Sequence, residues 1–186
     1  MIITHHREKL INAIIYFVQN TKYCGKTKLL KLLYFFDFKH FKEVGRSVTG
    51  LNYYAWGMGP VPKDLFEELS GNMNPDMISA ITITPKGCGF QLIQAQQKFN
   101  GRYFSQRELR LLDELSFIFK DATADIMIES THLKNEPWDK TLKEEGEFEK
   151  IDYMRALDAD KLSLSLDQAK ERLEERKEVY SLFGAD

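Results

Sequence analysis

The first two predicted elements are helices, because apolar residues recur in them at helical spacing. Residues 5–19 carry apolar positions three and four apart, which indicates a helix with one wide buried stripe. Residues 28–43 are apolar almost all round, and such a helix is expected at the centre of a fold. Thr27 can cap the start of this second helix, and Gly45 can end it.

The segment after the second helix has a different composition. Residues 46–61 contain four Gly and Pro residues together with an aromatic cluster at 53–56. We expect this segment to be ordered but irregular, without a regular helix or strand. Pro62 suits the first turn of a short helix over 63–70, and residues 72–75 then form a loop.

A β-hairpin and a capped helix follow. Residues 80–84 and 89–94 both alternate apolar and polar positions with period two, and Pro, Gly and Lys lie between them. A lone hairpin is only marginally stable in water, so this one must pack on the helices. Ser105 and Glu108 form a capping box that opens a helix extending to about residue 120.

The last part of the chain is more polar. A further helix is predicted over 123–133, residues 139–150 are charged and predicted to be mobile, and 165–183 form a very polar helix. Together the patterns predict a mainly α fold, a compact helical domain around a buried central helix. A small β-hairpin packs on this domain, and a C-terminal helical extension follows. We place the domain at 1–155 and the extension at 156–186.

Charge is distributed unevenly along the 186 residues. Residues 1–50 hold nine Lys and Arg against three Asp and Glu, whereas residues 121–186 hold ten against eighteen. One interpretation is a solvated surface of mixed sign. The other is a basic face for an acidic partner, or an acidic tail that mimics or screens such a partner. With 43% hydrophobic residues the chain can bury a core without disulfides or a structural metal.

The cysteines and the apolar runs indicate a cytoplasmic protein. Cys24 and Cys88 are scattered thiols, which fits a reducing compartment. The first residues lack the basic-then-apolar order of a signal peptide. The longest strongly apolar run, around 29–38, is interrupted by Lys31 and Asp37 and is too short for a membrane span. We therefore expect no membrane association.

One set of polar residues invites a catalytic hypothesis. Asp37 and His40 lie three apart and share a helix face, and His132 could join them as an acid–base set of a small hydrolase or transferase. The alternative is structural, because a carboxylate on an apolar helix must find partners. Asp37 would then cap the backbone of the glycine-rich loop or pair with a lysine or histidine. No His and Cys spacing matches a metal site, so we predict no metal and no cofactor.

The aromatic loop favours a protein partner. Tyr53, Tyr54 and Trp56 could stack on bases, and Lys26, Lys28 and Lys31 could contact phosphates. However, no nucleic-acid-binding signature is present and the domain is not basic overall. Aromatic residues with glycines are equally typical of protein-binding surfaces. We therefore take the three aromatic residues and Met58 as candidate anchors for a protein partner, and we argue against a nucleic-acid partner.

The order of these motifs over residues 8–155 resembles the Panacea domain of SocA-like antitoxins, a family that includes many phage-associated proteins. The resemblance begins with Lys31-Leu-Leu-Tyr-Phe-Phe-Asp37 and continues through the aromatic loop to Trp138. The signature residues that carry it, to which the resemblance gives a structural role, are Lys31, Leu33, Tyr34, Asp37, His40, Gly50, Gly59, Pro60, His132 and Trp138.

The resemblance implies a function by binding and no enzymatic activity. The expected activity is that of an antitoxin, which neutralises a cognate toxin, encoded by a neighbouring gene, through direct protein contact. SocA-type members imply an alternative, an adaptor that delivers the toxin to a cytoplasmic ATP-dependent protease. The hydrolase or transferase hypothesis remains a second alternative, and the oligomeric state stays open. The acidic C-terminal region could set the specificity for the partner.

Overall fold

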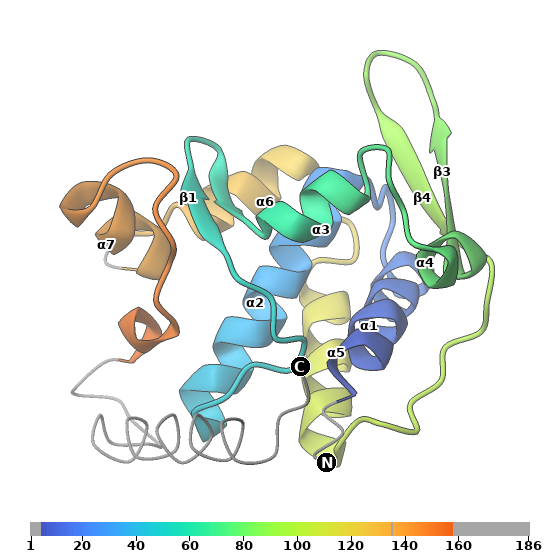
Figure 1. Cartoon of the computed structure of the whole chain (residues 1–186), viewed down its shortest axis with the longest axis horizontal. Helices are drawn as coiled ribbons and strands as arrows, with labels where there is room; N and C mark the ends of the chain where they lie inside the picture. The colour runs from blue at the N-terminus through green and yellow to red at the C-terminus, as the bar shows by residue number, and fades with distance from the viewer. Residues whose placement is uncertain (1–4, 135, 158–186) are drawn as a thin grey trace.

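The computed structural model describes residues 5–134 and 136–157, and Figure 1 shows their arrangement. In chain order the helices are α1 (His6–Asn20), α2 (Lys26–Val44), α3 (Lys63–Glu68), α4 (Pro75–Ala80), α5 (Gln106–Ile118), α6 (Ala124–Thr131) and α7 (Pro137–Glu144), followed by a 3-10 helix, η1 (Tyr153–Ala156). Two antiparallel hairpins pair β1 (Tyr54–Trp56) with β2 (Gly59–Val61) and β3 (Ile81–Pro85) with β4 (Gln91–Ala95). The predicted mainly α class is confirmed.

Helix α2 is buried over most of its surface, since apolar residues occur on nearly all of its faces. Twelve of its 19 residues are buried. Its end is the predicted one, because Gly45 adopts a left-handed conformation (φ 71°) and its N–H donates to the Phe41 carbonyl. The predicted cap at Thr27 is wrong, since the helix begins at Lys26 with Gly25 as the N-cap. A tertiary contact accounts for this start, because Gly25 forms a β-bridge with Leu92 of β4.

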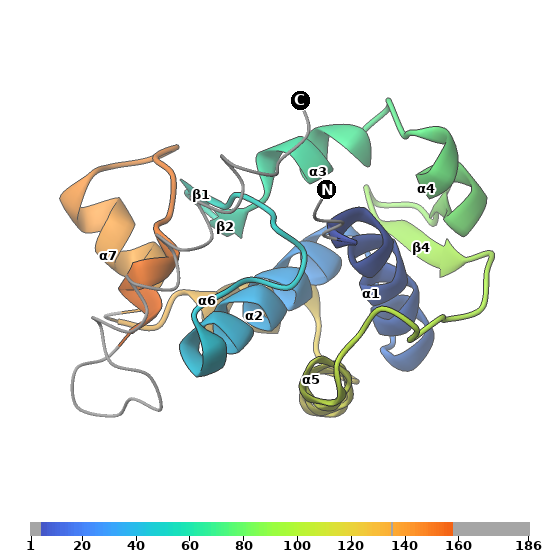
Figure 2. The same ribbon diagram turned by 60° about the horizontal axis from the view of Figure 1, so that its bottom comes forward.

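The main core lies where α1, α5 and α6 pack on α2. In Figure 2, α2 lies between the β1–β2 hairpin and α5, which is seen nearly end-on. The residues with no exposed surface in this core include Ala13, Ile14, Phe17, Leu29, Leu32, Leu33, Phe36, Leu111, Leu112 and Met127. The predicted capping box opens α5 as expected, with Glu108 N–H donating to the Ser105 hydroxyl and Ser105 N–H donating to the Glu108 carboxylate.

The structure corrects three expectations about irregular regions. Residues 46–61 include the short β1–β2 hairpin, in addition to irregular chain. Residue 75, expected to lie in a loop, begins α4, because Pro75 occupies the first helical position. Residues 139–150, expected to be mobile, belong largely to α7 and to an extended segment that pairs with β1. A local signal explains the start of α4, whereas contacts with distant parts of the chain order the other two regions.

The described chain continues in contact with α2 up to its last residue. Ala156 is buried beside Tyr53 and Trp138, and Leu157 is buried against Phe41 of α2. The predicted helix over 165–183 lies outside the described residues. None of the helices in the described ranges is both long and apolar enough to cross a membrane.

Candidate protein-binding surface

A buried carboxylate holds the segment that leads into β1. Asp37 has no exposed surface, and four groups donate hydrogen bonds to it. The backbone N–H groups of Val48 and Thr49 donate to Oδ1, both at 2.8 Å, while the hydroxyls of Thr49 and Tyr53 donate to Oδ2 at 2.5 and 2.8 Å. Burial raises the pKa of Asp37, and the four donors oppose this rise. We call Asp37, Val48, Thr49 and Tyr53 the Asp37 cluster. The Asp37 carboxylate thus caps the backbone N–H groups of the loop at Val48 and Thr49.

A second buried polar group holds the β1–β2 hairpin itself. Lys31 is 2% exposed, and its Nζ donates to the Pro60 carbonyl at 2.8 Å. Burial lowers the pKa of Lys31 to about 7. Gly59 passes so close to this ammonium that a Cβ there would lie 2.8 Å from Nζ and 2.7 Å from the Thr131 hydroxyl, and its φ of 97° also favours glycine.

The end of α6 and the start of α7 complete the support of the hairpin. The Trp138 indole N–H donates to the Trp56 carbonyl at 2.9 Å, and the Trp138 ring stacks on His132 at 4.0 Å. His132 makes a hydrogen bond with the backbone of Met58, while its burial and the charge of Lys31 lower its pKa. Signature residues that lie about one hundred positions apart therefore meet around one short hairpin.

The remaining signature residues also lie in contacts of the scaffold. Gly50 has a φ of 73° and lies against His6, where a Cβ would be 2.2 Å from the imidazole. Leu33 has no exposed surface in the main core, and Tyr34 packs on Phe38 with a ring distance of 4.3 Å.

The four candidate anchors divide into one scaffold residue and three surface residues. Tyr53 has no exposed surface and belongs to the Asp37 cluster, so it is removed from the candidate interface. Tyr54 and Trp56 are half-buried, and Met58, in the turn of the hairpin, is 67% exposed. Strand alternation explains this division, because successive residues of β1 face opposite sides.

One exposed aromatic residue beside this turn was not among the residues predicted from the sequence. Phe148 is 63% exposed, and its ring lies 6.1 Å from the ring of Trp56. The backbone places it there, since Phe148 N–H donates to the Ala55 carbonyl and Ile151 N–H donates to the Tyr53 carbonyl. The sequence did carry a signal for Phe148, because it is an aromatic residue directly after Gly146-Glu147 in a charged segment. We call Tyr54, Trp56, Met58 and Phe148 the hairpin surface.

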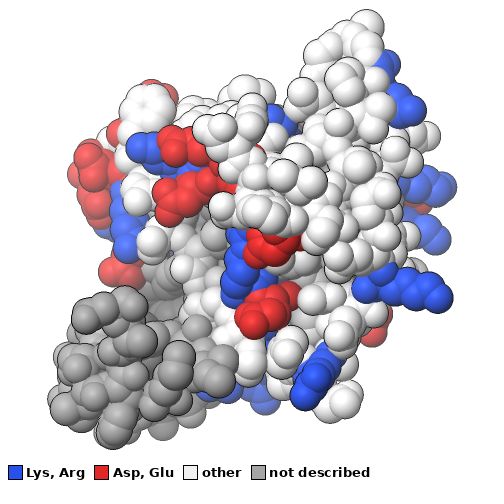
Figure 3. Space-filling view, turned by 45° about the vertical axis from the view of Figure 1, so that its right-hand side comes forward, with Lys and Arg blue, Asp and Glu red and all other residues white. Residues whose placement is uncertain are grey.

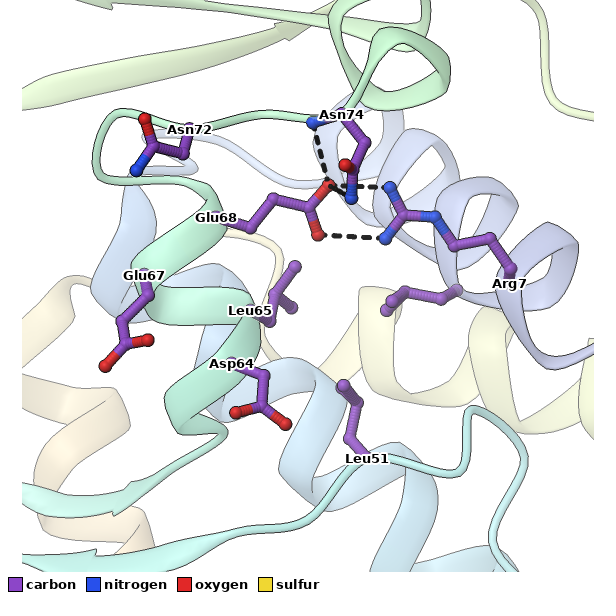
Figure 4. Close-up of a pocket in the computed structure, with 9 residues that line it drawn as sticks. Arg7, Leu51, Asp64, Leu65, Glu67, Glu68, Asn72 and Asn74 are labelled. Atoms are coloured by element: carbon purple, nitrogen blue, oxygen red, sulfur yellow. Dashed lines mark hydrogen bonds and ion pairs between the residues drawn. The ribbon is translucent and has the colours of Figure 1, made fainter. Parts of the chain in front are cut away.

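A partly acidic cavity of about 380 Å³ lies between α1, α3 and the chain that enters β1. Figure 4 shows Glu68 between Arg7 and Asn74, with Leu51 and Leu65 below them. Arg7 donates to both oxygens of Glu68 at 2.6 and 2.9 Å and also to Asp76, so it joins α1 to α3 and α4. This ion pair lowers the pKa of Glu68. Asp64 and Glu67 are exposed carboxylates that line the cavity, and Glu67 Oε1 lies 3.9 Å from Lys63 Nζ.

The proposed catalytic residues do not assemble into a site. Asp37 serves the Asp37 cluster, His40 Nδ1 lies 2.7 Å from the Arg46 carbonyl, and His132 stacks on Trp138. Within the described residues, no hydrogen bond or ion pair links any two of these three side chains. His40 is 2% exposed, and burial lowers its pKa. The structure therefore gives no support to the hydrolase or transferase hypothesis.

The charges are distributed unevenly on the face shown in Figure 3. Acidic and basic side chains lie in mixed groups at the left and centre of the view, whereas mainly basic side chains project along its right edge. Lys28 and Lys31, which the sequence made available for phosphates, are 1% and 2% exposed. Lys28 instead donates to the Lys22 and Ala122 carbonyls, both at 2.8 Å. Among the described residues, no group of three His, Cys, Asp or Glu side chains could hold a metal ion.

Comparison with known proteins gives one match. The model of the family described as "Antitoxin SocA-like, Panacea domain" matches residues 29–139, from the first turn of α2 to the first turn of α7. This range contains the Asp37 cluster, Lys31, both hairpins, His132 and Trp138. No curated protein and no solved structure shows a significant match.

Proposed function

Because the chain belongs to the family of SocA-like antitoxins with a Panacea domain, we propose that it neutralises a toxin by direct protein contact. The toxin would be the product of a neighbouring gene, and the two proteins would meet in the cytoplasm. The observation that carries the proposal is the hairpin surface, which presents two large apolar side chains to solvent on a firmly held backbone.

The support of the hairpin surface suits it to binding. Its backbone is held by the Asp37 cluster on one side and by Lys31 and Trp138 on the other. Met58 and Phe148 are therefore exposed side chains on a backbone that is held in place. A pre-organised surface loses less entropy on binding, and exposed aromatic residues and methionine are enriched at interfaces.

The charge around the hairpin surface is of both signs. Glu147 lies beside Gly57 in the hairpin turn, whereas the exposed Lys150 pairs with Tyr54 through a β-bridge. We propose that the toxin contacts this region with an apolar patch whose border carries charges of both signs. Such charges would set the association rate and the orientation more than the affinity.

Co-expression tests the function. The neighbouring gene product is induced alone and together with this protein in a host that lacks both, and growth is measured. Rescue by the wild type, loss of rescue with Met58→Glu, and retained rescue with Ile78→Glu are the expected results. Ile78 is a matched control because it is 55% exposed and lies on α4, remote from the hairpin surface in Figure 1. A neighbour that is harmless alone, or equally toxic beside this protein, refutes the proposal.

The half-life of the toxin separates blocking from delivery to a protease. We propose blocking, so the half-life should be unchanged or longer when this protein is present. A shorter half-life that depends on a host ATP-dependent protease would replace blocking by the adaptor mechanism.

A further inference from the structure

A basic cavity of about 720 Å³ lies between the end of α2 and the start of α5. Three arginines line it, namely Arg46, which follows the last residue of α2 by two positions, and Arg107 and Arg110 on α5. No Asp or Glu of the described chain lines this cavity. We call it the arginine cavity. In Figure 1 the end of α2 and the hairpin turn lie at opposite sides of the view, so the arginine cavity is separate from the hairpin surface.

The three guanidinium groups have unused hydrogen-bond donors. Arg46 is exposed, and its side chain makes no hydrogen bond or ion pair within the described residues. Arg107 Nε and Arg110 Nη2 lie 3.5 and 3.4 Å from the same oxygen of Glu43, Oε2. Close guanidinium–carboxylate pairs have N···O distances of about 2.7–2.9 Å, so both pairs with Glu43 are loose. The arginines therefore keep donors for a further anion.

The charge around the arginine cavity is positive. Three arginines face one carboxylate, that of Glu43, which leaves a net charge of +2. The nearby Glu108 does not reduce this charge, because it is 4% exposed and already pairs with Lys9 at 2.7 Å. His40 in the wall adds no positive charge, since burial and the charge of Arg46 lower its pKa. The cavity is therefore suited to a dianion.

Phosphate monoesters match this charge and these donors. A phosphate monoester carries a charge of about −2 at neutral pH, and guanidinium groups bind phosphate oxygens through two parallel N–H donors. The cavity is larger than a phosphate group needs, which leaves room for an organic part of the ligand. A nucleic-acid backbone carries one charge per phosphodiester and is bound along an extended basic track. Three arginines at one cavity therefore favour a small molecule.

We propose that the arginine cavity binds the phosphate group of a small phosphate monoester. Arg46, Arg107 and Arg110 donate hydrogen bonds to the phosphate oxygens, and the organic part of the ligand extends toward the open side of the cavity. This binding site goes beyond the neutralisation of a toxin and does not depend on it.

Calorimetry on the full chain, with inorganic phosphate and phenyl phosphate as probes at constant ionic strength, tests the site. Both probes should bind saturably, whereas chloride should not. Arg46→Gln should weaken the binding of both about tenfold or more, because it removes charge-assisted hydrogen bonds. Arg46→Lys keeps the charge but loses the planar fork, so it should weaken binding less. Arg102→Gln is the control and should stay within about twofold, because Arg102 is exposed but does not line the cavity.

Urea denaturation separates a lost ligand contact from a damaged fold. In phosphate-free buffer, Arg46→Gln should unfold at the same urea concentration as the wild type, because the Arg46 side chain has no partner there. Phosphate should raise the midpoint of the wild type more than that of Arg46→Gln.

Three results would overturn the proposal. The first is that neither probe binds saturably, and the second is that Arg46→Gln binds both probes as tightly as the wild type. The third is an oligonucleotide without terminal phosphates that displaces phenyl phosphate and binds more tightly, since this would identify the ligand as nucleic acid. None of these measurements involves the toxin, so their results are independent of the co-expression test.

Discussion

The two hairpins of this protein are held in place in different ways. The β3–β4 hairpin has five-residue strands, pairs from Ile81–Ala95 to Pro85–Gln91, and projects from the body in Figure 1. Its base is buried through Ile81 and Ile93, while residues 86–90 at its tip are exposed. The β1–β2 hairpin has three-residue strands, and buried polar side chains from α2 and α7 hold it.

The difference shows two ways to order a turn. A longer hairpin with alternating side chains supplies its own ladder of hydrogen bonds and needs only an apolar base. A three-residue hairpin supplies too few such bonds, so its position depends on contacts from elsewhere in the chain. Burying the polar side chains that make those contacts costs desolvation free energy, but the contacts fix the backbone of the turn. A binding surface benefits from a fixed backbone because less entropy is lost on binding.

The largest effect should come from breaking the Asp37 cluster. Asp37→Asn leaves an amide NH₂ facing hydrogen-bond donors, and we expect a loss of roughly 3 kcal/mol or more in the free energy of unfolding. Urea denaturation followed by circular dichroism measures this loss. Asp64→Asn is the control, because Asp64 is exposed in the open cavity and its change should cost no more than about 0.5 kcal/mol. A loss under about 1 kcal/mol for Asp37→Asn would contradict the role given to the cluster.

A smaller, pH-dependent effect should come from Lys31. Its pKa is about 7 in the folded protein against 10.5 for an ordinary lysine, so between these values the unfolded state binds more protons. Stability should therefore rise with pH in this window, because the cost of the buried charge disappears. Relative to Lys31→Met, the wild type should gain roughly 1–3 kcal/mol between pH 7 and pH 9.

Urea midpoints at pH 7, 8 and 9 would measure this gain. Lys86→Met is the control, because Lys86 lies on the exposed tip of the β3–β4 hairpin and its side chain is solvated. Equal pH dependence in the wild type and Lys31→Met would show that Lys31 is not buried in the charged form at neutral pH.

The smallest effect should come from the tip of the other hairpin. Cys88 is exposed and has a φ of 49°, a conformation that asparagine tolerates well. Cys88→Asn should change the unfolding free energy by no more than about 0.5 kcal/mol and leave toxin neutralisation intact. Thermal unfolding and the co-expression assay check both points. A large loss in either would show that the two tips are not as different as the structure indicates.

The regular elements could be predicted because their signals are local. The helical spacing of α1 and α2, the Ser105–Glu108 capping box and the alternation of β3–β4 each lie within a few turns of chain. The family match also rests on sequence alone. Asp37 could be assigned to the loop backbone, since a carboxylate on an apolar helix must find donors nearby.

The supports of the hairpin surface could not be predicted, because they join residues far apart in sequence. The bond from Trp138 to the Trp56 carbonyl spans 82 positions, and Phe148 is positioned by Ala55 through backbone pairing. Tyr53 and Met58 also look alike as candidate anchors in the sequence, yet one has no exposed surface and the other is 67% exposed.

The sequence by itself determined the mainly α class, the order of the long elements, the family and the need of Asp37 for partners. Only the tertiary structure decided which side chains around the hairpin face solvent and where Lys31 finds its acceptor. The reason is physical, because periodicity and capping act within one element, whereas burial depends on which surfaces meet when the elements pack.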